Sequence, residues 1–442
     1  MTAAPPARTG DDIFHPDFQQ RPFWWDDAPP DDGNTPLPPR VDVAIVGSGY
    51  CGLSAGLELA RAGLRIAVLD SGQIGEGAST RNGGMVSGGL KLPEKMRRKM
   101  GPERFERVMQ EAAKSFYYLE NFLEKEKFDA QYVRCGRFTG AHSPGAYHRL
   151  EAQADSIHRN TGFATNMVPK QAQHQEIGGD FYHGGMVVAE SGGLNPARYH
   201  RALRQAFIDA GGTLHGHSEV KNIARSAGGF TLQTSAGDMQ ADQVFVATNG
   251  YSGPVWPWLR RRIIPIASYV IATEELSPDL ISTLNPKARM LVDTKRILYY
   301  FRQSPDGRRI IFGGRASFRN SSEKTSAKSL HRFMCDVWPQ LGQTRITHAW
   351  KGNVGFSFDM LPHMGSHDGI HFAGSYQGTG VAMATYLGHQ SALKMLGRDQ
   401  APSVFGELRF PDNPLYHGTP WFLPIVGNYY RARDRFERWT GR

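Results

Sequence analysis

The feature that most constrains the fold is a short apolar run followed at once by three spaced glycines. Residues 41–46 read VDVAIV, a composition that suits a strand buried on both faces. Gly47, Gly49 and Gly52 then form the pattern G-x-G-x-x-G, and apolar residues recur at helical spacing until position 63. A second apolar run, RIAVLD at 65–70, completes the unit. Two parallel strands need a crossover of this kind, so the sequence predicts a β-α-β unit.

The glycines and an acidic residue at the end of the second strand indicate a dinucleotide site. Gly47 permits a tight turn, Gly49 lets the backbone approach a pyrophosphate, and Gly52 lets helix and strand pack closely. The N-terminus of the following helix offers N–H groups and the positive end of its dipole to phosphates. Asp70 is placed to accept hydrogen bonds from ribose hydroxyls. The motif alone does not distinguish NAD from FAD.

Two later glycine-rich segments favour FAD. Residues 75–84 read GEGASTRNGG, a long loop of glycine and hydroxyl residues directly after the second strand. A flavin must pass from the pyrophosphate to a buried ring, and a closely approaching backbone favours small residues there. Residues 374–380 read GSYQGTG and lead into a predicted helix at 381–396. The start of that helix would favour the negative charge of a reduced flavin.

Composition and charge exclude several classes of protein. The chain has 442 residues, of which 40% are hydrophobic, and this excludes a disordered chain. Its 50 glycines fall in short clusters and not in a collagen-like repeat. The net charge of +9 is compatible with nucleic acid, but the basic residues are dispersed. The basic cluster at 431–438 alternates with Asp434 and Glu437, which is typical of a solvated helix face. We therefore expect a mildly basic surface and no nucleic-acid partner.

Cysteine usage and hydropathy indicate a cytoplasmic protein. Cys51, Cys135 and Cys335 are far apart and odd in number, which argues against a disulfide framework or a cysteine zinc site. The start MTAAPPARTGDD lacks the order of a secretory signal, and no run reaches the ~20 apolar residues of a membrane span. We expect no membrane partner and no metal, since the pair His215 and His217 lacks a nearby third ligand.

At three places the sequence resembles the D-amino-acid oxidase (DAO) superfamily of FAD-dependent amine oxidases. The segments are VDVAIVGSGYCGLSAGLELA, LDSGQIGEGASTRNGG and AGSYQGTGVAMATYLG, and the resemblance covers residues 20–400. The branches most resembled are the gamma-glutamylputrescine oxidase-like and the glycine and sarcosine oxidase-like proteins. The resemblance implies an α/β fold, with a Rossmann-like (glutathione-reductase-like) FAD-binding domain and a substrate domain on a mixed or antiparallel sheet.

The resemblance also implies that both domains are discontinuous. The expected segments are an extended arm at 1–40, an FAD-binding domain at 41–100, 190–260 and 345–400, a substrate domain at 101–189 and 261–344, and a tail at 401–442. Within the arm, Phe23, Trp24 and Trp25 are expected to pack on the body of the protein, because exposed tryptophans are unfavourable.

The cofactor implied by the resemblance is tightly bound, non-covalent FAD. A cysteine-linked flavin is not supported, because no cysteine lies in 336–442, whereas His363 and His371 stay open as attachment points. Asp70 replaces the more usual glutamate at the ribose, and Val220 would meet the adenine through its backbone. The residues expected to contact FAD are Gly47, Gly49, Tyr50, Cys51, Gly52, Asp70, Ser71, Gly77, Ala78, Ser79, Thr80, Arg81, Asn82, Gly83, Gly84, Met85, Val220, Thr248, Asn249, Gly374, Gly378, Thr379, Gly380 and Val381.

The implied reaction is oxidation of the C–N bond of a small amine that bears a carboxylate. Hydride passes from the carbon next to the nitrogen to the flavin, the imine hydrolyses, and O2 reoxidises the flavin to give H2O2. In relatives such as glycine oxidase, an arginine at the place of Arg302 binds the substrate carboxylate, and a planar guanidinium suits that role. We therefore predict that Arg302→Ala raises KM. The other expected catalytic or substrate-binding residues are Tyr251, Tyr269, Tyr300, Arg315, Trp350, Lys351 and Phe356.

Several alternatives stay open at this point. The substrate is an N-substituted glycine such as iminodiacetate or sarcosine, which we favour slightly, or a gamma-glutamyl-polyamine. A dehydrogenase that uses another electron acceptor and a tRNA-modifying flavoprotein are further readings. A non-enzymatic FAD-fold protein is disfavoured, because the pyrophosphate, ribose and flavin motifs are all intact. The sequence does not set the oligomeric state.

Overall fold

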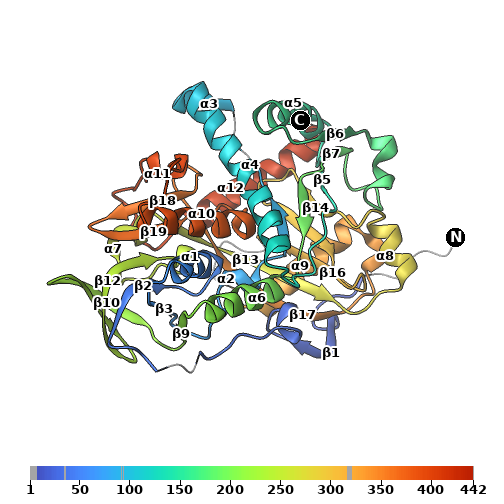
Figure 1. Cartoon of the computed structure of the whole chain (residues 1–442). Helices are drawn as coiled ribbons and strands as arrows, with labels where there is room; N and C mark the ends of the chain where they lie inside the picture. The colour runs from blue at the N-terminus through green and yellow to red at the C-terminus, as the bar shows by residue number, and fades with distance from the viewer. Residues whose placement is uncertain (1–6, 34–35, 91, 93, 316–320, 442) are drawn as a thin grey trace.

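Two large sheets and a small two-stranded sheet organise the chain (Figure 1). The computed structural model describes residues 7–33, 36–90, 92, 94–315 and 321–441. Residues 1–6 and 34–35 of the predicted arm therefore lie outside the described part. The mixed α/β architecture expected from the sequence is confirmed.

The first large sheet holds the predicted β-α-β unit. Its parallel core has the strand order β9-β3-β2-β12-β19. These strands are β2 (Arg40–Val46), β3 (Ile66–Leu69), β9 (Thr213–His215), β12 (Gly237–Val246) and β19 (Ile370–Gly374). Antiparallel partners extend the sheet, namely β10 (Val220–Ser226), β11 (Gly229–Thr234) and β18 (His363–His367). The segments expected at 41–100 and 190–260 thus meet in one sheet.

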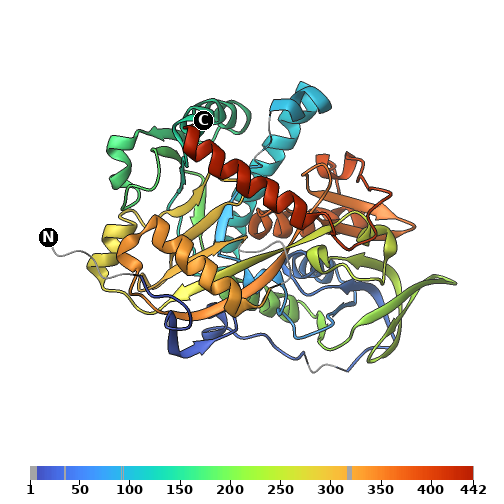
Figure 2. The same ribbon diagram turned by 180° about the vertical axis from the view of Figure 1, so that it is seen from behind.

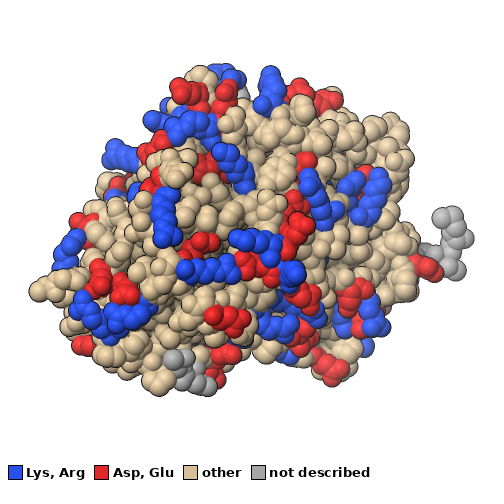
Figure 3. All heavy atoms as spheres, in the orientation of Figure 1, with Lys and Arg blue, Asp and Glu red and all other residues tan. Residues whose placement is uncertain are grey.

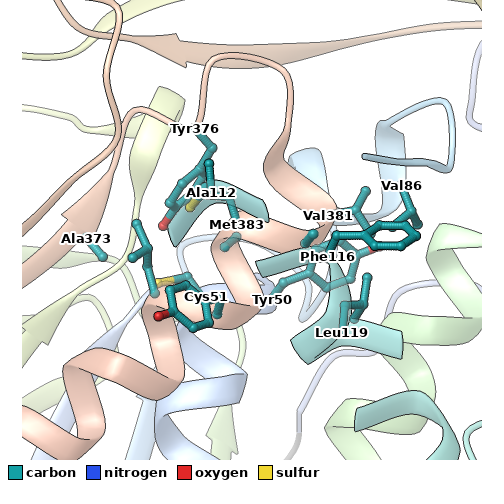
Figure 4. Close-up of a cluster of buried hydrophobic side chains, with 14 of the residues drawn as sticks. Tyr50, Cys51, Val86, Ala112, Phe116, Leu119, Ala373, Tyr376, Val381 and Met383 are labelled. Atoms are coloured by element: carbon teal, nitrogen blue, oxygen red, sulfur yellow. The ribbon is translucent and has the colours of Figure 1, made fainter. Parts of the chain in front are cut away.

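Helices from distant parts of the chain pack together on this sheet. They are α1 (Tyr50–Arg61), α4 (Pro102–Lys125), α6 (Pro196–Asp209) and α10 (Gly380–Met395). Figure 4 shows the contact, where Cys51 of α1, Phe116 of α4 and Met383 of α10 point into one apolar cluster. Asn195 caps α6, because its side chain accepts hydrogen bonds from the first-turn N–H groups.

The second large sheet has nine strands in the order β1-β17-β13-β16-β15-β14-β5-β7-β6. Their bounds are β1 (Phe14–Gln19), β5 (Arg137–Gly140), β6 (Thr165–Val168), β7 (Gly185–Val188), β13 (Ile264–Thr273), β14 (Met290–Asp293), β15 (Tyr299–Gln303), β16 (Ile310–Gly314) and β17 (Ile346–Phe356). Most neighbours are antiparallel, but β1–β17 and β14–β5 are parallel. The expected boundary at 345 is wrong for β17, because this strand pairs along its length with β13 and so belongs to the second sheet.

The remaining elements connect or cover the sheets. The small sheet joins β4 (Met85–Ser87) to β8 (Ser191–Gly193). The other helices are α2 (Ala78–Arg81), α3 (Glu94–Met100), α5 (Pro144–Thr161), α7 (Pro257–Arg260), α8 (Pro278–Leu284), α9 (Glu323–Val337), α11 (Val404–Glu407) and α12 (Leu423–Thr440). Short 3-10 turns are η1 (Phe23–Asp26), η2 (Lys170–Gln175), η3 (Asn249–Tyr251) and η4 (Pro339–Leu341). No helix within the described residues is long and apolar enough to cross a membrane.

The N-terminal arm packs on the body, as predicted. Trp24 is buried, and its Nε1 donates to the carbonyl of Asn82 (2.9 Å). Trp25 donates from Nε1 to Oγ1 of Thr80 (2.9 Å). The arm therefore holds α2, which belongs to the predicted FAD loop.

The C-terminal helix α12 has the predicted solvated face for its arginines but not for its two carboxylates. Figure 2 shows it lying across the surface on the side hidden in Figure 1. Asp434 and Glu437 are buried against the protein, where they pair with Arg296 at 2.9 and 2.7 Å. Large apolar side chains face outward beside the exposed Arg433, Arg435 and Arg438. On the opposite side of the molecule, basic and acidic residues are intermixed (Figure 3).

Candidate active site

A cavity of about 1500 Å³ lies between the two large sheets. One wall comes from the carboxyl ends of β2 and β3, at Gly47 and Asp70. The other wall is a face of the nine-stranded sheet, at residues such as Ile266, Tyr300 and Val354. Ligands of open parallel sheets bind outside the carboxyl ends of the strands, which is where this cavity lies.

The turn after β2 has the geometry that its glycines predict. Gly47 has φ of +107°, a backbone region that favours glycine. A Cβ atom on Gly52 would lie 2.0 Å from the carbonyl oxygen of Gly47, so a side chain there would push α1 off the turn. The N–H of Tyr50 donates to Oγ of Ser79 (3.0 Å), and this bond connects the start of α1 to the loop at residues 75–84. The first turn of α1 therefore meets the cavity with the N–H groups that bind anions at helix N-termini.

Two residues outside the predicted set hold the ribose acceptor in place. Ser48 donates to Oδ2 of Asp70 from its N–H (2.9 Å) and from its Oγ (2.6 Å). Behind it, Nε2 of His200 lies 2.7 Å from the carbonyl oxygen of Ser48. Burial lowers the pKa of His200 to about 4, so the ring is neutral and Nε2 donates. Asp70 keeps further lone pairs for ribose hydroxyls. Position 48 is a variable place in the glycine motif, so the pattern gave no signal for it.

Most of the predicted FAD residues line the cavity. They are Gly47, Gly49, Tyr50, Cys51, Asp70, Ser71, Gly77, Ala78, Ser79, Arg81, Asn82, Gly83, Met85, Val220, Thr248, Asn249, Gly378, Thr379, Gly380 and Val381. Four others lie behind its wall and shape it, namely Gly52, Thr80, Gly84 and Gly374. Thr80, for example, is buried and bonds to the carbonyl of Gly75 and to Trp25. The Thr80 side chain therefore supports the loop from behind, because its hydroxyl is bonded within the protein.

The loop before α10 is held in an unusual conformation. Ser375 and Gln377 have φ of +64° and +57°, which costs energy for residues with a side chain. The N–H of Ser375 donates to Oδ1 of Asn249 (2.8 Å), and Gln377 contacts Oγ of Ser357 (2.8 Å). Asn249 thus positions the loop, in addition to lining the cavity. The strained loop presents the N-terminus of α10 to the cavity at Gly378 and Thr379.

These features fit FAD. A Cβ atom on Gly77 or Gly378 would project into open space, so a ligand can approach the backbone closely at both loops. The wall of the cavity includes the Asp70 carboxylate, the start of α1 and the start of α10, together with Tyr300 of the second sheet. The residues that would hold the ribose, the pyrophosphate and the ring thus share one continuous space. When bound, FAD would supply hydride acceptance.

Residues 75–84 and 374–380 are the two loops predicted to hold FAD, and we call them the FAD loops. The wall that faces them carries three of the predicted substrate residues. Tyr300 lies across Gly313, where a side chain would clash with the ring, and its hydroxyl pairs with Oγ of Ser268 (2.9 Å). The guanidinium of Arg315 lies 4.8 Å from the ring centre of Phe356. Burial lowers the pKa of Arg315. Tyr300, Arg315 and Phe356 all line the cavity, as does Tyr251, whose hydroxyl accepts from the N–H of Asn353 (3.2 Å).

The structure does not support the predicted role of Arg302. This residue shares a sheet face with Tyr300, but the β4–β8 sheet covers it. Its Nη1 donates to the carbonyls of Gly84 (3.0 Å) and Leu194 (2.9 Å). Arg302 is buried and lies outside the cavity wall. Its guanidinium therefore holds the carbonyls of Gly84 and Leu194 and is not available to a substrate carboxylate.

Three other predicted substrate residues need correction. Tyr269 points to the opposite face of the sheet, where its hydroxyl bonds to Ser321 before α9. Lys351 contributes to the cavity wall, but its Nζ pairs with Glu323 of α9 (3.4 Å). Trp350 is buried, with its Nε1 bonded to the carbonyl of Arg81 (2.8 Å). A supporting role fits these three better than contact with substrate.

Sequence reasoning missed three arginines of the cavity, namely Arg137, Arg296 and Arg433, and of these only Arg137 has no carboxylate partner among the described residues. Arg137 in β5 lines the cavity, and its Nε has no hydrogen-bond partner. Burial lowers the pKa of Arg137 to about 10. No motif surrounds it, and only the pairing of β5 with β14 brings it to this wall.

Comparisons of the sequence with known proteins agree with this site. Residues 42–392 match the family described as DAO, FAD dependent oxidoreductase. The chain is 27% identical over 424 residues to a probable oxidoreductase OrdL of Rhizobium meliloti, covering 93% of this chain and 97% of that protein. It is 28% identical over 400 residues to the gamma-glutamylputrescine oxidoreductase of Escherichia coli, covering 89% of this chain and 93% of the relative.

Solved structures share the fold. The glycine oxidase of Geobacillus kaustophilus superposes with a TM-score of 0.68 at 20% identity, over 86% of this chain and 99% of the other. The iminodiacetate oxidase of Chelativorans sp. BNC1 superposes with a TM-score of 0.67 at 16% identity, over 82% and 98%. The chain belongs to the DAO family of FAD-dependent oxidoreductases and is an enzyme that uses FAD.

Proposed function

We propose that this enzyme oxidises the C–N bond of a small amine that bears a carboxylate, such as an N-substituted glycine, and that Arg315 binds the carboxylate. Five arginines line the cavity within the described part of the chain. Three are paired with carboxylates, namely Arg81, Arg296 and Arg433. Arg137 and Arg315 have no carboxylate partner among the described residues, and these unmatched charges carry the proposal.

Arg315 is the better placed of the two. Arg315 directly follows β16 and lies two residues after Gly313, so both residues are on the same face of the sheet. Gly313 pairs with Tyr300, and the Arg315 side chain therefore projects toward the ring of Tyr300 and the FAD loops. Phe356 supports one face of its guanidinium and leaves the fork of N–H groups for a ligand. A buried cation without a counterion is costly, and a substrate carboxylate would remove that cost through two parallel hydrogen bonds.

The rest of the wall would orient an uncharged amine. Ile264, Ile266 and Val354 give it an apolar surface that excludes water and disfavours a protonated nitrogen. Tyr300 keeps its hydroxyl engaged with Ser268, so it offers a flat wall. Bound FAD would accept the hydride from the carbon next to the nitrogen, and O2 would then regenerate it with release of H2O2.

Arg137 favours a second candidate, an extended substrate such as a gamma-glutamyl-polyamine or a long dicarboxylate. β5 lies three strands from β16. At about 4.8 Å per strand, the two arginines sit on strands about 14 Å apart. A short monocarboxylate would engage Arg315 alone, whereas an extended substrate would need both arginines. The relation to a gamma-glutamylputrescine oxidoreductase supports including such a compound in the test.

Anaerobic bleaching of the flavin absorbance tests the proposal. The panel is glycine, sarcosine, iminodiacetate, gamma-glutamylputrescine and putrescine. We expect bleaching by carboxylate-bearing amines and little or none by putrescine, which has no carboxylate. Equal bleaching by putrescine would contradict the proposed recognition. Admission of air should return the oxidised spectrum with release of H2O2, whereas reduction of an added dye without H2O2 would identify a dehydrogenase.

A further inference from the structure

The helix α12 exposes a continuous stripe of large apolar side chains. The stripe consists of Trp421, just before the helix, with Ile425, Tyr429, Phe436 and Trp439. Their exposed fractions run from 50% to 83%, the highest being that of Trp439. At 100° per residue these positions fall within one narrow sector of the helix surface. Single exposed apolar residues are ordinary, but an aligned stripe of this length indicates a binding surface.

The inner face of α12 shows that this orientation is fixed. Leu423, Gly427, Asp434 and Glu437 are the buried residues of the helix. Besides its two bonds to Arg296, the helix is held by Arg149, which donates to Glu437 at 3.1 Å. The N–H groups of residues 296 and 297 also donate to the Asp434 carboxylate. Turning the stripe inward would break this buried network, so the apolar side chains stay outside.

The charge exposed beside the stripe is basic. The helix carries Arg431, Arg433, Arg435 and Arg438, while both of its carboxylates are buried. Tryptophan, tyrosine and phenylalanine on one face with arginines flanking them is the pattern of helices that lie in the interface of a bilayer. Anionic lipid headgroups would match the arginines, and the stripe would enter the acyl boundary.

We propose that α12 binds the enzyme to an anionic lipid surface, with the stripe inserted and the helix axis parallel to the membrane plane. This adds a lipid partner to the expectation from the sequence, which included none. The lipid surface is preferred over a second copy of the chain. Pairing of two stripes would bring the arginines of one helix against those of the other, and the two carboxylates of each helix are buried and already bonded to Arg149, Arg296 and Arg433.

Flotation of the purified holoenzyme with vesicles tests this proposal. One set contains phosphatidylglycerol and phosphatidylcholine in equal parts, and the other contains phosphatidylcholine alone. The variant Phe436→Ser with Trp439→Ser removes part of the stripe without touching the cavity wall. Arg435→Gln with Arg438→Gln removes exposed charge. Ile208→Ser is the matched control, because Ile208 is 43% exposed on α6, away from the stripe.

We expect the holoenzyme to float with the anionic vesicles, and the fraction bound to fall as salt is raised. The stripe variant should lower the partition coefficient by at least about tenfold. The arginine variant should weaken binding to anionic vesicles, and Ile208→Ser should bind as the parent does. Flavin absorbance and amine turnover in solution should be unchanged in every variant. The proposal is overturned if the holoenzyme does not float with anionic vesicles. It is also overturned if the chain is a dimer in solution that the stripe variant makes monomeric.

Discussion

Replacement of Arg315 by methionine is the sharpest test of the proposed substrate site. Methionine keeps much of the side-chain length and the contact with Phe356 but removes the guanidinium. Arg315 has no carboxylate partner among the described residues, so its loss breaks no ion pair within that part of the protein. We therefore expect Arg315→Met to fold, to retain FAD and to lose affinity for carboxylate-bearing amines.

The magnitude follows from the environment of the guanidinium. A hydrogen bond to a charged group contributes about 1.5–3 kcal/mol, and a bidentate pair makes two such bonds. Part of this gain is offset by desolvation of the carboxylate, so we expect a net loss of about 3 kcal/mol. That loss corresponds to a decrease of about 150-fold in kcat/KM. Most of it should appear as a higher Kd, because the carboxylate bonds exist before hydride transfer.

Anaerobic stopped-flow reduction separates the two quantities. The dependence of the bleaching rate on amine concentration gives Kd and the limiting rate independently. Arg302→Met is the matched control, since it removes a buried arginine from the neighbouring strand. This control should leave the carbonyls of Gly84 and Leu194 without their donor. It should therefore lower Tm and weaken FAD retention, while Kd for the amine changes little.

Two results would refute this reasoning. An unchanged amine Kd in Arg315→Met would show that the carboxylate is bound elsewhere. A large rise in amine Kd in Arg302→Met, with Tm and FAD content intact, would restore the role that the sequence suggested. A further variant, Arg137→Met, distinguishes the substrate classes. It should weaken gamma-glutamylputrescine or a long dicarboxylate more than sarcosine.

Three further predictions concern the scaffold. Gly52→Ala places a methyl group 2.0 Å from the carbonyl oxygen of Gly47, so the purified protein should contain little FAD, as its absorbance ratio will show; full flavin content would contradict the packing argument. Trp24→Ala should cost about 3–5 kcal/mol of unfolding free energy, because a buried aromatic side chain is removed; urea titration measures this, and a loss below 1 kcal/mol, on the order of a surface substitution, would mean that the arm is dispensable. The pKa of His200 is depressed to about 4, so its contribution to stability is complete above the unfolded value near 6.5 and is lost as pH falls toward 4. The difference between the folded and unfolded pKa of His200 amounts to about 3 kcal/mol. His200→Gln keeps a donor for the Ser48 carbonyl but does not titrate, so unfolding free energy should depend less steeply on pH between 6.5 and 4; an unchanged slope would assign the acid sensitivity to other groups.

The dinucleotide site was predictable because its determinants are local. The strand, the turn and the helix of the β-α-β unit are consecutive in the chain, and steric limits at Gly47 and Gly52 fix the residue type. The same holds for the loop before α10. What the motif could not show is that Ser48 and His200 hold Asp70, because His200 arrives from a helix far along the chain.

The substrate wall was less predictable. Alternation along a strand predicts which residues share a face of the sheet, but it does not predict which of them another element covers. Tyr300 and Arg302 are two residues apart and share a face, yet only Tyr300 meets the cavity. The β4–β8 sheet, built from two distant segments, covers Arg302. Trp350 is covered in the same way by α2 and the arm. Tyr269 lies on the other face, and the sequence held no sign of which face would meet the cavity.

The position of Arg296 connects the active site to the outer face of α12. This arginine lines the cavity, but its guanidinium is committed to Asp434 and Glu437, which excludes it as a carboxylate receptor. The same ion pairs fix the rotation of α12, whose residues Leu423 and Val426 line the cavity together with Phe422 just before the helix. Because these ion pairs contribute to the attachment of α12 beside the buried Leu423, the remaining large apolar side chains are free to face outward. The enclosure of the substrate site and the exposure of the stripe therefore have one physical cause, the burial of two carboxylates on the inner face of α12.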